Sequence, residues 1–242
     1  MSCKALTSSR IEHAESNAHE RHVPIGALEP AAERREPCAP ANVFWHAGAV
    51  SGEMRARRFG CAPLTFWLTG LSGAGKSTIA YELENSLIRD AQPCAVLDGD
   101  NLRHRLNCDL GFSERDRHEN VRRTAEVARL MNENGLVVVA SLVSPYRDDR
   151  EAAKAIIGVD RFVEVYVSTS LDVCESRDPK GLYRKARSGE ICGFTGVSSP
   201  YEPPNAPTLT VDTATLTPAA AAAVLHAYLR ERNGGIDRVA HG

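Results

Sequence analysis

The sequence predicts an α/β fold of three layers, in which helices cover both faces of a central parallel five-stranded sheet, together with a lid segment. Two observations support this prediction. Short apolar, β-favouring runs alternate with segments of helical periodicity, and such alternation is typical of right-handed βαβ units. The chain has 242 residues, which is enough for one α/β domain with a sizeable core and a tail.

Composition narrows the classes of partner. The chain carries 29 Lys and Arg residues against 31 Asp and Glu residues, a formal net charge of −2. This balance gives no whole-chain attraction to nucleic acid or membranes, so we expect neither as a partner. The seven cysteines form no Cys-x-x-Cys pair, which argues against a zinc site and a disulfide framework and fits a cytoplasmic setting. No apolar run approaches the roughly 20 residues of a membrane span.

Residues 1–41 differ from the rest of the chain. They combine many charges with few large apolar residues and with four prolines, Pro24, Pro30, Pro37 and Pro40. Their glutamates argue against an organelle transit peptide, which is poor in acids. We therefore expect a disordered or weakly ordered extension at 1–41, with a regulatory or docking arm as the alternative. The domain is predicted over 42–234, and 235–242 form a C-terminal tail.

The most informative motif is the run from Gly70 to Ser77, which fits the phosphate-binding pattern Gly-x4-Gly-Lys-Ser/Thr. The apolar run 64–69 precedes it and reads as a buried strand, and 78–89 follows as a helix. In that context backbone N–H groups can surround a phosphate. Lys76 would reach the β- and γ-phosphates, and the Ser77 hydroxyl would bind Mg²⁺. A Gly-rich turn that matches by chance is the alternative, and the flanking strand and helix disfavour it.

Two aspartates follow the next predicted strand, 94–97. Ligands of parallel α/β sheets bind at the carboxyl ends of the strands, so Asp98 and Asp100 should face the phosphate loop. There they can orient Mg²⁺ and accept a proton from an attacking hydroxyl. The alternative is an Asx turn with a helix N-cap.

The middle of the chain predicts a short helix at 101–106, a turn at 110–112 and a long helix that Ser113 caps and that runs to about Asn134. Six arginines surround its start, and guanidinium groups suit sulfate and phosphate oxygens, although a charge run can equally be a solvated helix face. They are Arg103, Arg105, Arg115, Arg117, Arg122 and Arg123.

The remaining elements complete the alternation. Strands are predicted at 136–140, 162–167 and 209–211, and helices at 148–157, 171–176 and, capped by Thr217, 218–232. The segment 177–207 is too long and too rich in Gly, Pro and basic residues for an ordinary connection, which is typical of a lid or a disordered loop.

At this point the motifs resemble those of adenylyl-sulfate (APS) kinases. The resemblance rests on 70–78 (GLSGAGKST), 98–103 (DGDNLR), 110–112 (LGF), 116–120 (DRHEN), 144–147 (SPYR), 177–183 (RDPKGLY) and 193–196 (GFTG). It extends from about residue 42 to the last helix. It implies a P-loop kinase fold with a lid at about 177–207. The implied reaction, part of sulfate assimilation, is transfer of phosphate from ATP to the 3′-hydroxyl of adenosine 5′-phosphosulfate, with Mg²⁺ as cofactor.

The resemblance also implies roles for individual residues. Asp100, Asp98 and Lys76 would be catalytic, together with Ser144, which is sometimes assigned in the family as a phosphoserine; Ser77 and Asp98 would hold Mg²⁺. The ATP site would comprise Gly70, Leu71, Ser72, Gly73, Ala74, Gly75, Lys76, Ser77, Thr78 and Arg177. The APS site would comprise Asp100, Arg103, Phe112, Arg117, Asn120, Val143, Ser144, Lys180, Gly193 and Phe194, with the two phenylalanines stacking on the adenine.

Some points stay open on the sequence. Transfer between two bound nucleotides needs positioning and charge neutralisation and no covalent relay, which favours a positioning role for Ser144. Arg105 and Cys192 depart from the family pattern, where Gly and Lys are usual.

The partners expected are a second copy of the chain in a homodimer and, functionally, ATP sulfurylase. The rival hypotheses are a non-catalytic nucleotide-binding module and another P-loop kinase, such as a gluconate, shikimate or nucleoside monophosphate kinase.

Overall fold

The computed structural model describes residues 42–44, 46 and 48–234. Every helix and strand that it describes lies within 48–234. The predicted extension at 1–41 and the tail at 235–242 lie outside the described residues.

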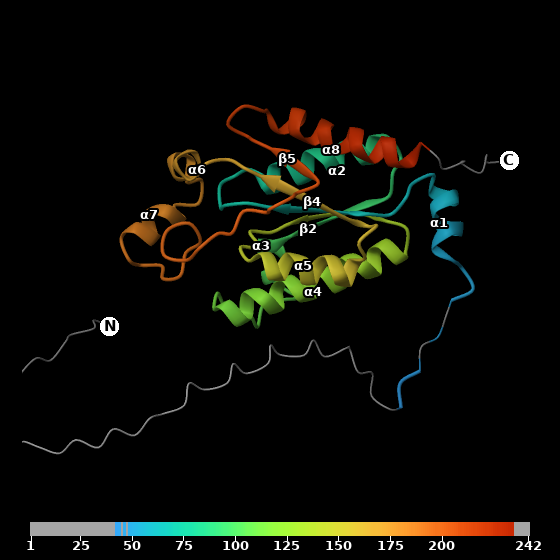
Figure 1. Ribbon diagram of the computed structural model, residues 1–242, viewed down its shortest axis with the longest axis horizontal. Coiled ribbons are helices and arrows are strands. Elements are labelled where there is room, and N and C mark those ends of the chain that lie inside the picture. The colour runs from blue at the N-terminus through green and yellow to red at the C-terminus, as the bar shows by residue number, and fades with distance from the viewer. Residues whose placement is uncertain (1–41, 45, 47, 235–242) are drawn as a thin grey trace, which may run out of the picture. The chain divides into compact units, whose positions relative to one another are not determined.

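The centre of the fold is an all-parallel, five-stranded sheet, as predicted (Figure 1). Its strands stand in the order β2-β3-β1-β4-β5, so that β1 is the central strand. Thr65 of β1 lies opposite Val138 of β3 on one side and Phe162 of β4 on the other. The strand bounds are β1 Thr65–Thr69, β2 Cys94–Asp98, β3 Val137–Ser141, β4 Phe162–Val167 and β5 Leu209–Val211.

Helices cover both faces of this sheet (Figure 1). Helices α2 (Lys76–Arg89) and α8 (Pro218–Asn233) lie on one face, and α4 (Glu114–Glu133) and α5 (Arg147–Ile157) lie on the other. Successive side chains of β1 alternate between the two layers: Phe66 and Leu68 join the core beneath α2 and α8, and Trp67 joins the core beneath α4 and α5. The three-layer fold class is therefore confirmed.

Two helix starts follow the predicted capping. Ser113 Oγ accepts a hydrogen bond from Asp116 N at 3.2 Å, and Thr217 Oγ1 accepts one from Ala220 N at 3.2 Å. Each cap satisfies a backbone N–H that a helix leaves unpaired in its first turn. Pro218 occupies the first turn of α8, as expected of a residue that lacks this N–H.

The bounds of one predicted helix were wrong, and another helix was not predicted. The short helix α3 spans Gly99–Arg103 instead of 101–106, because the Asp98 side chain caps it earlier and accepts from Asp100 N at 3.0 Å. Helix α1 (Gly52–Phe59), which follows the cap Ser51, was not predicted. Its sequence carries no apolar stripe and none of its residues is buried, so the periodicity that marks the other helices is missing.

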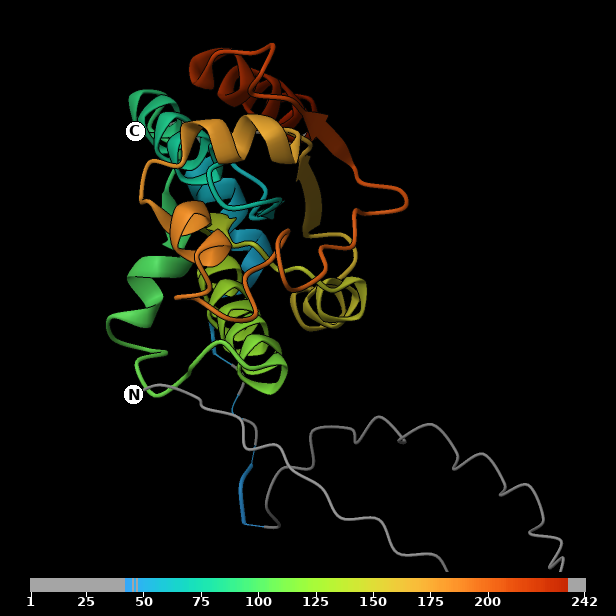
Figure 2. The same cartoon turned by 90° about the vertical axis from the view of Figure 1, so that its left-hand side faces the viewer.

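The predicted lid contains regular structure. After α6 (Leu171–Arg177) the chain forms α7 (Leu182–Arg187), and Figure 2 shows both in front of the sheet when viewed from this end. Tyr183 of α7 is buried, and its hydroxyl donates to Ser72 O at 2.9 Å. One buried aromatic side chain thus attaches the lid to the phosphate loop.

Candidate active site

A cavity of about 590 Å³ lies at the carboxyl edge of the sheet. It brings together sixteen of the residues proposed from the sequence, which come from the phosphate loop, the ends of β2 and β3, α4 and the lid. They are Ser72, Gly73, Gly75, Lys76, Ser77, Thr78, Asp98, Asp100, Arg103, Phe112, Arg117, Asn120, Val143, Ser144, Arg177 and Lys180. Five others lie outside its lining: Gly70, Leu71, Ala74, Gly193 and Phe194.

The phosphate loop has a backbone that only glycine allows at its first position. Gly70 has φ +151°, and a Cβ there would lie 2.5 Å from Val167 O. Elsewhere the loop is held by hydroxyl groups, because Tyr183 donates to Ser72 O and Thr213 Oγ1 donates to Ala74 O at 2.9 Å. The loop backbone is therefore held by Val167 of β4, by Thr213 after β5 and by Tyr183 of the lid.

Lys76 begins α2 and its side chain lies inside the loop. Its Nζ donates to Gly70 O at 3.0 Å and to Leu71 O at 2.7 Å, and the residue is buried. Burial lowers the pKa of Lys76 from 10.5 to about 8, since removal from water penalises the charged form. An anion in the loop would offset this penalty and would replace the carbonyl contacts.

Asp98 uses its two carboxylate oxygens in two ways. Oδ1 caps α3, and Oδ2 accepts from Ser77 Oγ at 2.6 Å. Ser141 Oγ lies 3.2 Å from Ser77 Oγ. The N-cap interpretation and the metal-site interpretation of Asp98 are thus compatible, because one oxygen serves each.

Asp100 stands at the opening of the cavity. Its side chain is 67% exposed and forms an ion pair with Lys180 of the lid. The pair joins α3 to the segment before α7, so the lid contacts the carboxylate that is proposed to accept the proton.

Two of the six arginines line the cavity, and both contact Phe112. Arg103 Cζ lies 4.5 Å from the centre of the Phe112 ring, which is a cation–π distance. Arg117 donates to Phe112 O at 3.0 Å and to Gly193 O at 2.9 Å. Burial lowers the pKa of both guanidinium groups. The aromatic ring itself is 66% exposed, so its face can be covered by a ligand in place of Arg103.

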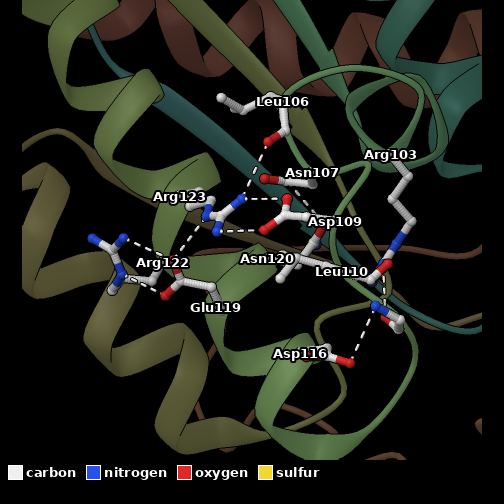
Figure 3. A network of polar contacts seen from close by, with 11 residues as sticks. Arg103, Leu106, Asn107, Asp109, Leu110, Asp116, Glu119, Asn120, Arg122 and Arg123 are labelled. Carbon is white, nitrogen blue, oxygen red and sulfur yellow. Dashed lines mark hydrogen bonds and ion pairs between the residues drawn. The ribbon is translucent and has the colours of Figure 1, made fainter.

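Arg122 and Arg123 instead belong to a surface network (Figure 3). Both donate to Glu119, and they hold its pKa at about 2. Arg123 also forms a bidentate ion pair with Asp109, in which Nη1 and Nη2 donate to Oδ1 and Oδ2 at 2.7 and 2.9 Å. The solvated-face alternative is therefore what the structure shows for these two arginines, and Arg123 ties the loop before α4 to the helix.

Ser144 sits in an unusual backbone conformation on the cavity wall. Its φ is +37°, in the left-handed region, and its side chain is buried. Its Oγ accepts from Trp67 Nε1 at 3.1 Å, and its carbonyl accepts from Arg150 Nη1 at 2.7 Å. The neighbouring Val143 carbonyl accepts from Thr69 Oγ1 at 2.8 Å. This wall is held on both sides by buried groups.

Phe194 lies against the protein core. Its ring contacts Tyr183 edge-on, with centroids 5.0 Å apart at 83°, and packs against the core beneath α2 and α8. The Gly-flanked polar sequence around Phe194 gives no sign of this packing. It arises because the buried Tyr183 of α7 brings an apolar surface to this part of the lid.

Sequence reasoning did not propose three hydroxyl-bearing residues of the site. Ser141 and Thr213 line the cavity, and Tyr183 holds the loop. Thr213 Oγ1 accepts from Arg177 Nη1 at 2.7 Å, which places Arg177 beside the phosphate loop. Ser141 ends β3, and Thr213 follows β5 by two residues. The rule that ligands meet the carboxyl ends of strands could have found both.

These features define a class. The central strand of a parallel sheet runs into a Gly-rich loop that holds a buried lysine. A hydroxyl lies beside a carboxylate, and a lid lies opposite. This arrangement is typical of the active site of a P-loop kinase.

The comparisons with known proteins give the family. The family model "Adenylylsulphate kinase" matches residues 62–212. The adenylyl-sulfate kinase of Geotalea daltonii is 51% identical over 191 residues, covering 79% of this chain and 94% of that protein. The chain belongs to the adenylylsulphate kinase family. This membership excludes the gluconate, shikimate and nucleoside monophosphate kinase alternatives.

Solved structures agree with this assignment. The Mycobacterium tuberculosis APS kinase CysC, solved in complex with AMPPNP and APS, is 44% identical with a TM-score of 0.68, covering 70% of this chain and 99% of that one. The hexameric APS kinase of Thiobacillus denitrificans is 30% identical with a TM-score of 0.53, covering 75% of this chain but 32% of that one.

Proposed function

We infer that the chain is an adenylyl-sulfate kinase, which transfers phosphate from ATP to the 3′-hydroxyl of adenosine 5′-phosphosulfate and yields ADP and 3′-phosphoadenosine 5′-phosphosulfate. The observation that carries this is one cavity with two unlike halves. The phosphate loop forms one half, Arg103, Arg117 and Phe112 form the other, and Asp100 stands at the opening. Such a cavity can hold two nucleotides with a carboxylate beside them.

We propose these roles for the charged groups. Lys76 stabilises negative charge on the transferring phosphoryl group, because it lies inside the loop where the β- and γ-phosphates would sit. Asp100 accepts the proton of the 3′-hydroxyl, which makes that oxygen the nucleophile. For this, Lys180 must release Asp100 and turn toward the phosphate or sulfate oxygens.

Mg²⁺ is proposed at Ser77 and Asp98. One hydroxyl and one buried carboxylate oxygen, 2.6 Å apart, are the oxygen donors that this ion prefers. Among the residues that the structure describes, no cluster of three His, Cys, Asp or Glu side chains could hold a metal ion. Mg²⁺ is usually bound through one or two carboxylates and the phosphates of its nucleotide. When bound, the ion would neutralise charge on the β- and γ-phosphates.

The experiment is an assay of ADP formation from ATP with and without APS, with the nucleotide product identified by mass. We expect ADP formation to depend on APS and the product to carry a new 3′-phosphate. ADP formation that does not depend on APS, or the absence of any ADP formation, would favour the rival hypothesis of a non-catalytic nucleotide-binding module.

The oligomeric state and the cellular location of the protein are further proposals. Within the described ranges, no helix combines the length and apolar character that crossing a membrane requires. We propose a cytoplasmic homodimer that receives its substrate from ATP sulfurylase. The hexamer of Thiobacillus denitrificans is built from a chain of which this one covers only 32%. Light scattering on the purified protein would give twice the 26.3 kDa chain mass for the dimer.

The domain limits are also proposed. Residues 42–234 are assigned to the kinase domain, with the lid at about 177–207. Deleting 1–41 should then leave turnover and thermal stability close to those of the full chain. Loss of either would place part of the domain before residue 42.

A further inference from the structure

We propose that Asn107 is a positioning residue for the acceptor substrate. It orients the side-chain amide of Asn120 so that the NH₂ group, and not the carbonyl oxygen, faces the cavity. This inference rests on the proposed function, because it takes Asn120 to contact APS. Asn107 itself does not line the cavity.

The amide of Asn120 is held through its oxygen. Asn107 Nδ2 donates to Asn120 Oδ1 at 3.0 Å, and both residues are buried. Within the part of the chain that the structure describes, no group accepts a hydrogen bond from Asn120 Nδ2. Since Asn120 lines the cavity, its remaining hydrogen-bonding capacity there is that of a donor.

Asn107 is fixed by its own backbone. Its N–H donates to Leu102 O at 2.9 Å, and its carbonyl accepts from Leu110 N at 3.1 Å. The side chain is fully buried, so it cannot turn away into solvent. Figure 3 shows Asn107 on the loop before α4, with Asn120 on the helix opposite. The backbone of Asn107 is thus fixed, and the one hydrogen bond of its side chain goes to Asn120 Oδ1, which leaves Asn120 Nδ2 for the ligand.

The orientation matches the charge of this half of the cavity. Arg103 and Arg117 already present donors there. An NH₂ group adds a further donor for sulfate, phosphate or ribose oxygens. The opposite orientation would present a carbonyl oxygen, which repels an anion.

Asn107 is not needed to hold the loop in place. Arg123 already ties the loop to α4 through two bonds to Asp109 and one to Leu106 O at 3.2 Å. Asp109→Asn weakens this attachment without touching Asn120, and so it serves as the matched control. Asn107 Oδ1 is buried without a partner, so the residue has only one side-chain bond to lose.

The test is steady-state kinetics with ATP and APS on three variants. Asn107→Leu removes the donor at similar volume. Asn107→Asp can only accept, so it should draw Asn120 Nδ2 inward and turn Oδ1 to the cavity. We expect the KM for APS to rise roughly tenfold in Asn107→Leu and further in Asn107→Asp, as for the loss of a bond to a charged group. The KM for ATP should change little, and Asp109→Asn should stay near the parent. If the buried charge prevents Asn107→Asp from folding, the KM for APS of Asn107→Leu alone decides the test.

A double-mutant cycle separates positioning from structure. In an Asn120→Ala background, Asn107→Leu should raise the KM for APS no further, because the amide that it orients is gone. Full additivity, an unchanged KM for APS in Asn107→Leu, or equal effects on both substrates would overturn the inference while the parent enzyme stays active. If the parent shows no APS-dependent ADP formation, the proposed function fails first and the inference with it.

Discussion

The two halves of the cavity are built differently. The phosphate loop follows the central strand, its lysine is buried, and hydroxyls from β5 and the lid hold its backbone. In the other half Phe112 is 66% exposed, and the guanidinium groups of Arg103 and Arg117 lie over its ring. Protein groups fix the loop backbone of the first half, whereas the second half consists of side chains that contact one another. Variants should therefore affect chemistry in the first half and APS affinity in the second.

The largest effect is expected at Lys76. Lys76→Met keeps most of the buried stem but removes the cation, so turnover should fall by about 10³-fold or more. Because Lys76 is buried, Lys76→Ala would add a cavity to the loss of charge. Single-turnover kinetics measure the change, and circular dichroism checks the fold. Near-normal turnover in a folded Lys76→Met would remove Lys76 from the mechanism.

Asp100 should come next. Asp100→Asn keeps the shape but loses the proton acceptor, and turnover should fall by about 10²-fold or more, with a smaller effect on ATP binding. The control is Asp172→Asn on α6, an exposed carboxylate outside the cavity. If ATP affinity changes most, Asp100 acts as a metal-shell residue and the base lies elsewhere.

The aromatic ring of Phe194 tests the second half of the cavity. For Phe194 to stack on the substrate adenine, the ring must leave Tyr183 when APS binds. Base stacking contributes about 1–3 kcal/mol in nucleic-acid complexes, so Phe194→Ala should raise the KM for APS roughly 5- to 150-fold and that for ATP little.

Val197→Ala is the matched control for this variant, because Val197 packs on the same core from the same part of the lid. Trypsin cleavage at Lys180, Arg184, Lys185 or Arg187 should also slow when ADP and APS are bound. Equal effects on both substrates, or an equal effect in the control, would mean that Phe194 only packs.

A smaller, pH-dependent effect is expected for ATP binding. With a pKa of about 8 in the free protein, Lys76 carries its charge below that pH and loses it above. The dissociation constant of a non-hydrolysable ATP analogue should therefore rise about tenfold between about pH 7 and pH 9. Calorimetry measures this dissociation constant. In Lys76→Arg, which stays charged, the dissociation constant should not rise over this pH range. A flat profile in the parent would mean that the lysine titrates above this range.

The sequence predicted more of the first half than of the second. Strand order along the chain, the Gly pattern and the carboxyl-edge rule placed Lys76, Ser77 and Asp98 in one site, because local patterns determine that loop. They could not show that Tyr183 anchors the lid or that Phe194 packs on it, since these contacts join residues far apart in sequence. Nor could they separate Arg103 and Arg117 from Arg122 and Arg123, because which side chains of α3 and α4 face the cavity depends on tertiary packing.

The smallest effect on turnover is expected at Ser144, on the cavity wall. A phosphoserine relay requires an accessible hydroxyl, but this one is buried and accepts from the Trp67 indole. Ser144→Ala should therefore keep turnover within about tenfold of the parent. It should cost about 1–3 kcal/mol of stability, because the buried indole N–H loses its acceptor. Thermal unfolding and steady-state kinetics separate the two effects. A chemically competent phosphoserine, or complete loss of turnover with both substrates still bound, would contradict this and make Ser144 a catalytic residue.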